Sequence, residues 1–94
     1  MQPETETQSI LSQVPFAGSD VLEIGCGPGR FTLAHLTTAR SVLGLDPNGE
    51  AIAALQKHWA TQGLRAKGDF RQGSIVDFPL PAEQFDVVVF SRSF

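Results

Sequence analysis

Cysteine is almost absent from this chain of 94 residues, which contains only Cys26. A single cysteine cannot form an internal disulfide, so the sequence predicts a reducing, cytoplasmic environment. Long apolar runs are also missing: the longest, FDVVVF at 85–90, includes Asp86 and is far too short to span a bilayer. The first residues, MQPETETQSIL, are acidic and polar and do not have the order of a signal peptide.

Basic charge is scarce as well. Seven lysines and arginines stand against ten acids, which gives a formal net charge of -3. This balance provides no electrostatic footprint for nucleic acid or for an anionic membrane, so we expect neither as a partner. The hydrophobic fraction of 41% and the charged fraction of 18% are those of a globular protein, and the length predicts one small domain or a piece of a larger one.

Short apolar runs alternate with helical patterns along the chain. We expect strands at 20–24, 41–46, 70–72 and 86–90, and helices at 30–38 and from an Asn48 cap to about Gln62. In the first helix Phe31, Ala34 and Leu36 should face inward, and in the second Ile52, Leu55 and Trp59. This alternation builds a parallel sheet, so the sequence predicts an α/β fold of the doubly wound kind with helices on both faces.

Two units are expected from this pattern. Residues 1–19 form an N-terminal tail with a short helix at 7–14, and residues 20–94 form the main part. Only SRSF follows the apolar run at 86–90, and an apolar strand left at an open edge invites pairing with another chain. We therefore expect a sheet truncated after its fourth strand, the N-terminal part of a longer domain, with self-association through that strand.

Three glycines, Gly25, Gly27 and Gly29, follow the first expected strand in the sequence VLEIGCGPGR. Glycines in such a loop let the backbone come close to a ligand. A dinucleotide fingerprint needs G-x-G-x-x-G, but its third position here is Arg30, and the spacing is G-x-G-x-G. A nicotinamide-dependent oxidoreductase is therefore disfavoured, and a structural turn without a ligand stays an alternative.

Two acids near the loop indicate the chemistry of a ligand. Glu23 would repel a pyrophosphate but suits an amine or a sulfonium, and the helix start after Gly29 suits a carboxylate. Asp46 ends the second strand 17 residues after Gly29, where an acid can accept hydrogen bonds from ribose hydroxyls. A ligand with a ribose, a zwitterionic amino-acid tail and no phosphate is required. S-adenosylmethionine is the common cofactor of that description.

Four segments in order, EIGCGPG, GLDPN, FRQGSIVDFPLP and FDVVVFSRSF, carry a family resemblance over residues 20–94. The chain resembles class I S-adenosylmethionine-dependent methyltransferases, most closely the small-molecule group that includes the ubiquinone and menaquinone methyltransferase-like enzymes. The resemblance implies a Rossmann-like fold and methyl transfer to a small-molecule acceptor. It also implies a cofactor site made of Glu23, Gly25, Cys26, Gly27, Gly29, Asp46, Pro47, Ser74, Ile75, Phe90 and Ser91.

Each part of this implied site has a role in the resemblance. Glu23 and the glycines would line the methionine moiety, and Asp46 would hold the ribose. A backbone N–H near Ile75 would meet the adenine, while Phe90 and Ser91 would lie near the methyl group and the substrate. In the commoner pattern an acid follows the glycine at 73, whereas here Ser74 follows it and the nearest acid is Asp77. Which of the two contacts adenine stays open.

No catalytic residue is assigned from the sequence. There is no Ser/His/Asp or Cys/His arrangement and no metal-ligand cluster, and in methyl transfer the cofactor itself carries the reactivity. Cys26, between two glycines, is interpreted as a small loop residue and not as a nucleophile. A second hypothesis of another class is a non-catalytic nucleotide-binding or interaction module that has kept the motif.

Overall fold

The computed structural model describes residues 16–74, 76 and 84–91. Several sequence predictions lie outside these residues, namely the short helix at 7–14 and the site residues Ile75 and Asp77.

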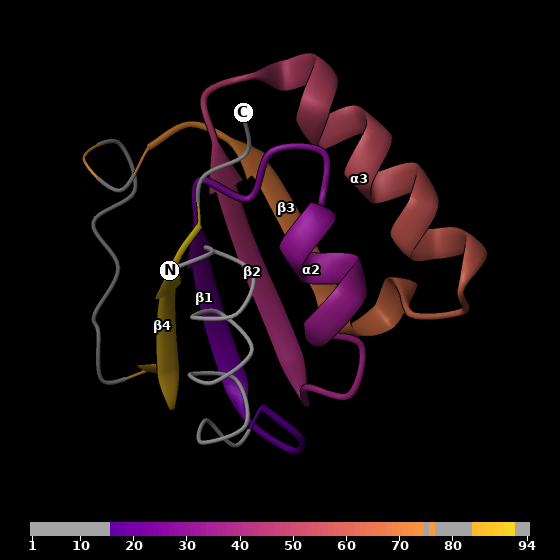
Figure 1. Cartoon of the computed structure of the whole chain (residues 1–94), viewed down its shortest axis with the longest axis vertical. Coiled ribbons are helices and arrows are strands. Elements are labelled where there is room, and N and C mark those ends of the chain that lie inside the picture. The colour runs from indigo at the N-terminus through magenta and orange to yellow at the C-terminus, as the bar shows by residue number, and fades with distance from the viewer. Residues whose placement is uncertain (1–15, 75, 77–83, 92–94) are drawn as a thin grey trace, which may run out of the picture.

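The centre of the fold is a four-stranded sheet (Figure 1). Its strands are β1 (Asp20–Ile24), β2 (Ser41–Asp46), β3 (Gly68–Gln72) and β4 (Val87–Phe90). They lie in the order β3-β2-β1-β4, and every pair of neighbours is parallel. The predicted parallel α/β sheet is confirmed. β1 and β2 have the predicted bounds, because continuous apolar runs mark strands that are covered on both sides.

Among the described residues, α-helices and a 3-10 turn connect β1 to β2 and β2 to β3. They are α2 (Arg30–His35), α3 (Gly49–Thr61) and η1 (Arg65–Lys67). The Asn48 side chain caps α3 as predicted, since its Oδ1 accepts hydrogen bonds from the N–H groups of Glu50 (3.0 Å) and Ala51 (3.2 Å). α2 is shorter than the predicted 30–38, because after His35 the chain turns toward β2.

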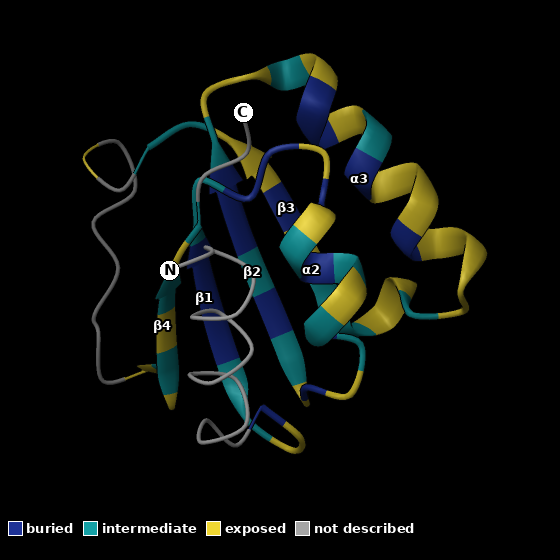
Figure 2. Cartoon of the chain, viewed as in Figure 1, coloured by how far each residue is buried: buried dark blue, intermediate teal, exposed yellow. Residues whose placement is uncertain are grey.

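Both described helices pack on one face of the sheet. The strand register places Gly44 beside Phe70, and Phe70 meets Trp59 of α3 edge-to-face at 5.3 Å between ring centroids. The buried core on this face consists of Phe16, Val21, Cys26, Leu36, Ala39, Val42, Ile52, Leu55, Trp59 and Phe70. In Figure 2 the buried side of α3 is turned toward the strands and its outer side is exposed. Helical cover of the opposite face remains an expectation.

The predicted inward face of α2 is confirmed for Leu36, which is fully buried, and for Phe31, which packs against the core, but it is wrong for Ala34. Ala34, expected to face inward, is exposed, whereas Thr32 is fully buried, and Phe31 is half-buried. The sequence RFTLAHLTT offers apolar residues on more than one face, and a polar threonine gives no sign of burial. The true phase follows from a buried polar partner of Thr32, described below.

β4 has an apolar face that is open to solvent. Val88 is 40% exposed and Phe90 is 77% exposed, and in the register both lie on the face opposite Val87 and Val89. An exposed apolar strand face is a place where another chain or segment can pack. Self-association through β4 therefore stays a prediction.

A polar cluster closes the amino ends of β1, β2 and β4. Arg40 contacts the Asp20 carboxylate through Nε (3.0 Å) and Nη2 (2.5 Å), and the Ser41 hydroxyl donates to it at 2.7 Å. Asp86 accepts a hydrogen bond from the Asp20 N–H at 2.8 Å. The hydrogen bonds from Arg40 and Ser41 lower the pKa of Asp20 from 3.8 to about 2.

This pKa predicts how the protein responds to acid. Because the folded-state pKa of Asp20 is depressed, its contribution to stability is present above about pH 3.8 and is lost as the pH falls toward 2. In Asp20→Asn that contribution is absent, so its melting temperature should depend less on pH in this window. Thermal unfolding followed by circular dichroism at several pH values between 2 and 5 measures the difference. Arg40→Gln removes the main cause of the depressed pKa and should flatten the curve as well. Wild-type steepness in both variants would contradict the prediction.

Candidate cofactor-binding site

The glycine loop lies where the carboxyl ends of the strands meet, at the top of the sheet in Figure 1. It connects β1 to α2, and Gly25, Gly27 and Gly29 have φ angles of +81°, +53° and +97°. Side chains rarely adopt this left-handed region, so the backbone path requires glycine at these positions. The predicted loop after the first strand is confirmed.

Two of the glycines make room for the protein itself. A Cβ at Gly25 would clash with the carbonyl oxygen of Ser91, directly after β4, and a Cβ at Gly29 would clash with Leu55 of α3. The Ser91 N–H also donates to the Ile24 carbonyl at 2.9 Å. The backbones at the ends of β1 and β4 are therefore in direct contact, and the start of α2 packs against the Leu55 side chain.

Asp46 holds the loop from the end of β2. Its Oδ2 accepts a hydrogen bond from the Gly27 N–H, and its Oδ1 accepts one from the Asn48 N–H, both at 2.9 Å. The carbonyl of the preceding Leu45 accepts hydrogen bonds from the N–H groups of Gly25 (2.8 Å) and Cys26 (3.2 Å). A carboxylate offers about four lone-pair sites, so the half-buried Asp46 keeps acceptor capacity for a ligand hydroxyl.

Glu23 lies beneath the loop and is fully buried. The Thr32 hydroxyl donates to its Oε1, and the Ser91 hydroxyl donates to its Oε2 at 2.5 Å. Burial raises the pKa of Glu23, while the two hydroxyl hydrogen bonds act in the opposite direction and the charge of Asp46 adds to the rise. The carboxylate that the sequence assigns to a ligand amine is thus held by protein hydroxyls, and its contact with a ligand stays a prediction.

Sequence reasoning missed Thr32. It comes three residues after Gly29, and its only sequence signal is a hydroxyl placed in the helix that follows an acid-glycine motif. A buried threonine next to a buried carboxylate is readily explained by the contact, because a buried charge needs hydrogen-bond donors.

Cys26 is buried in the loop, and burial raises the pKa of its thiol to about 12, with further contributions from the charges of Glu23 and Asp46. A thiol with such a pKa is protonated at neutral pH and is a poor nucleophile. The interpretation of Cys26 as a small loop residue agrees with this environment.

The other predicted site residues are less closely grouped. Pro47 is exposed beside Asp46, and Ser74 is half-buried after β3, whose end is tied to β2 by the hydrogen bond from the Gly73 N–H to the Asp46 carbonyl (2.9 Å). Phe90 pairs with Ile24, so its side chain lies on the opposite face of the sheet from Glu23. The structure thus brings Glu23, the glycines, Asp46 and Ser91 together, and turns the Phe90 side chain away from Glu23.

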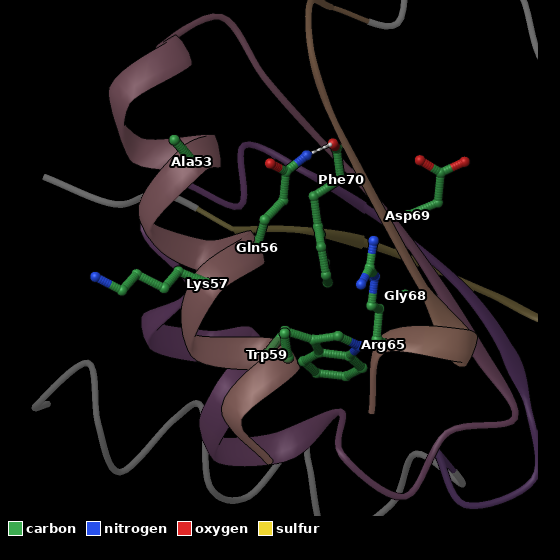
Figure 3. A pocket seen from close by; sticks show the side chains of 9 residues that line it. Ala53, Gln56, Lys57, Trp59, Arg65, Gly68, Asp69 and Phe70 are labelled. Atoms are coloured by element: carbon green, nitrogen blue, oxygen red, sulfur yellow. Dashed lines mark hydrogen bonds between the residues drawn. The ribbon is translucent and has the colours of Figure 1, made fainter. Parts of the chain in front are cut away.

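A hollow of about 560 Å³ lies elsewhere, between α3 and β3 (Figure 3). Its lining includes Gln56, Trp59, Arg65 and Phe70, and Gln56 donates to the Phe70 carbonyl at 2.7 Å. It contains no residue of the predicted cofactor site. The hollow is therefore separate from the chemistry that the loop and its acids indicate.

A protein-family model described as a methyltransferase domain matches residues 21–94, which include every element that forms the site. The chain belongs to this methyltransferase domain family. The family assignment confirms the predicted resemblance to methyltransferases, and it favours neither the nicotinamide-dependent hypothesis nor the non-catalytic one.

Named relatives agree with this membership. The chain is 33% identical over 75 residues to a ubiquinone biosynthesis O-methyltransferase of Azorhizobium caulinodans, with 80% of this chain and 29% of that protein covered. Among solved structures, a phosphoethanolamine N-methyltransferase of Haemonchus contortus, in complex with phosphoethanolamine and S-adenosylhomocysteine, is 31% identical with a TM-score of 0.75. That match covers 92% of this chain and 18% of the other.

An S-adenosylmethionine-dependent methyltransferase of Mesorhizobium loti is 26% identical with a TM-score of 0.72, over 94% of this chain and 39% of that one. S-adenosylmethionine, the cofactor predicted from the sequence, is thereby confirmed for the family. The chain spans between 25% and 39% of the curated relatives' own length.

Some structures of the same fold are named RNA methyltransferases, such as one from Salinibacter ruber with 18% identity and a TM-score of 0.73. At that identity the likeness shows the fold alone, so the expected lack of a nucleic-acid partner stays an expectation. In the part of the chain that the structure describes, no helix has the length and apolar character needed to cross a membrane.

The backbone contact at Gly25 can be tested by adding one methyl group. Gly25→Ala places a Cβ at a positive φ and against the Ser91 carbonyl, so it should lower the free energy of unfolding by about 2–4 kcal/mol. Gly18→Ala is a matched control, because Gly18 has a φ of +73° and open space around its Cβ position. The control should cost roughly 1–2 kcal/mol, the price of the backbone conformation alone. Urea unfolding measures both, and equal losses would show that the contact with Ser91 is unimportant.

Burial of Glu23 predicts a second pH effect, opposite in sign to that of Asp20. Since the folded-state pKa of Glu23 lies above its ordinary value of 4.5, stability is greatest below that pH and falls as the pH rises through the folded-state pKa. Glu23→Gln removes this loss, so its melting temperature relative to wild type should increase from pH 4 toward neutrality. Glu50→Gln, in which an exposed acid of α3 is changed, is the matched control. A Glu23→Gln variant with the wild-type pH dependence would disprove the assignment.

Proposed function

We propose that this chain is the cofactor-binding part of an S-adenosylmethionine-dependent methyltransferase that transfers a methyl group to a small-molecule acceptor. The observation that carries the proposal is the convergence of β1, β2 and β4 on one glycine loop, which Asp46 joins through its hydrogen bond to Gly27. Ligands of open α/β sheets bind at the carboxyl ends of the strands, which is where these groups meet.

The polar groups at this edge suit such a cofactor. Asp46 keeps lone pairs that can accept from two ribose hydroxyls, and it lies next to the end of β3 through the Gly73 hydrogen bond. The start of α2 after Gly29 supplies backbone N–H groups for a carboxylate. Glu23 supplies negative charge beneath the loop, which favours a cationic group above it. Adenine recognition at the turn after β3, through Ser74, Ile75 or Asp77, belongs to the same proposal.

The bound cofactor would provide a methyl group already activated by its sulfonium. The residues of this chain would orient it: the glycine loop and Asp46 fix its position, and Ser91 lies at the end of β4, beside the loop. Alignment of the methyl carbon with an acceptor atom is the main task that remains for the protein.

A small-molecule acceptor is favoured by the ubiquinone biosynthesis O-methyltransferase among the relatives and by the phosphoethanolamine N-methyltransferase among the solved structures. A cytoplasmic location is part of the same proposal, because a lone cysteine needs no oxidising compartment. Neither feature identifies the acceptor itself.

The proposal is tested by calorimetric titration of the 94-residue chain with S-adenosylmethionine and, separately, with NAD. We expect saturable binding of the first and none of the second. Asp46→Ala should weaken binding by about 1–3 kcal/mol, since it leaves ribose hydroxyls and the Gly27 N–H without their acceptor. Asp69→Asn is the matched control, because it removes an exposed acid of β3 that is paired with Arg71 and not with the loop.

Circular dichroism of the same samples shows whether a chain that gives no binding heat is folded. A folded chain that binds no S-adenosylmethionine would overturn the proposal, and binding of NAD instead would revive the oxidoreductase hypothesis. Equal affinities for wild type and Asp46→Ala would remove Asp46 from the site.

A further inference from the structure

Three side chains from three elements form one hydrogen-bond chain beneath the glycine loop. Thr32 of α2 donates to one oxygen of Glu23 in β1, and Ser91, directly after β4, donates to the other oxygen at 2.5 Å. Thr32 and Glu23 are both 0% exposed. Hydrogen bonds to a buried charged group are worth more than ordinary ones, so the loss of either donor leaves an oxygen of a buried carboxylate unsatisfied.

Within residues 16–74, 76 and 84–91, the donors to the Glu23 carboxylate are neutral hydroxyls, and the charge that acts on it, that of Asp46, has the wrong sign to stabilise the carboxylate. Asp46 at the end of β2 raises the pKa of Glu23 further. Cys26, in the loop, is a neutral thiol whose own pKa is about 12. From α2 and from the end of β4 the groups that reach the carboxylate are Thr32 and Ser91. The two hydroxyls are therefore what favours a charged Glu23 in its buried place.

Ser91 also ties the loop to β4. Its hydroxyl lies 3.1 Å from the Gly25 carbonyl oxygen, and its N–H donates to the Ile24 carbonyl at 2.9 Å. A displacement of this residue would break contacts to β1, to the first glycine of the loop and to Glu23 at once. The end of β4 and the glycine loop thus share one anchor.

We propose that Thr32 and Ser91 are positioning residues of the cofactor site, which act through Glu23 to hold its carboxylate and the glycine loop in the geometry that binds the cofactor. The expected effect on cofactor binding rests on the proposed function. The inference goes beyond that function in giving roles to Thr32, which the sequence motif does not contain, and to the Ser91 hydroxyl.

Matched variants separate the hydroxyl from the volume of the side chain. Thr32→Val keeps the shape and removes the donor, whereas Thr32→Ser keeps the donor. Ser91→Ala and Ser91→Thr form the same pair at the end of β4. The donor-free variants should bind S-adenosylmethionine at least about tenfold more weakly, which equals about 1.4 kcal/mol, and the donor-keeping variants should stay close to wild type.

A second readout needs no cofactor. The side-chain carboxyl carbon of Glu23, assigned by its loss in Glu23→Gln, is followed by ¹³C NMR during a pH titration of the 94-residue chain. Because each hydroxyl favours the carboxylate, the pKa of Glu23 should be higher in Thr32→Val and in Ser91→Ala than in wild type, and the Thr32→Ser variant should restore it. If these residues served only to fill space and did not hydrogen-bond to Glu23, their loss would lower the melting temperature but would not move this titration.

The two readouts distinguish the inference from the function on which it rests. A higher pKa with weaker binding supports both. An unchanged titration in both donor-free variants overturns the inference, whether or not the chain binds cofactor. If wild type is folded and binds no cofactor, the proposed function fails and with it the positioning role, even where the titration moves. Should Thr32→Val not fold, Ser91→Ala decides, because Ser91 is only partly buried and its side chain is small.

Discussion

Direct contact between the glycine loop and the strand ends is the constraint on which the site depends. At Gly25 the loop backbone lies against the carbonyl of Ser91, and at Gly29 the start of α2 lies against Leu55, with no room for a side chain at either glycine. Asp46 completes the arrangement by accepting a hydrogen bond from Gly27. Because β1, β2, β4 and α3 all reach the loop, its conformation depends on the packing of the whole sheet and not on the loop sequence alone.

Electrostatics differ sharply between the two ends of β1. At the amino end the Asp20 carboxylate pairs with Arg40, and the pKa of Asp20 falls to about 2. At the carboxyl end Glu23 is buried among hydroxyls, and its pKa rises. Asp20 stabilises the amino ends of the strands through its ion pair with Arg40, whereas Glu23 lies where burial makes its charged form unfavourable. A buried carboxylate of this kind is typical of functional sites, and its position agrees with the cofactor site proposed at the carboxyl ends of the strands.

Relatives named for different reactions each match most of this chain. Ubiquinone biosynthesis and phosphoethanolamine methylation are named for two of them, and these matches cover 80% and 92% of this chain but only 29% and 18% of the relatives. This pattern is expected if the shared part binds the cofactor, as proposed above. A fold carries many functions, and the choice of acceptor has to be argued from other contacts.

Local chemistry alone determined much of this protein. A few neighbouring residues are enough to predict the apolar runs of β1 and β2, the Asn48 cap of α3 and the glycine spacing after β1. The reason is that strand burial, helix capping and positive φ angles impose local residue preferences. Tertiary structure decided the rest. Ser91 reaches Glu23 across 68 positions of sequence, and the phase of α2 turns Thr32 inward to meet the same carboxylate. No local pattern encodes these contacts. A buried carboxylate needs hydrogen-bond donors, and the packing of strands and helices distant in sequence decides which hydroxyls lie close enough to donate.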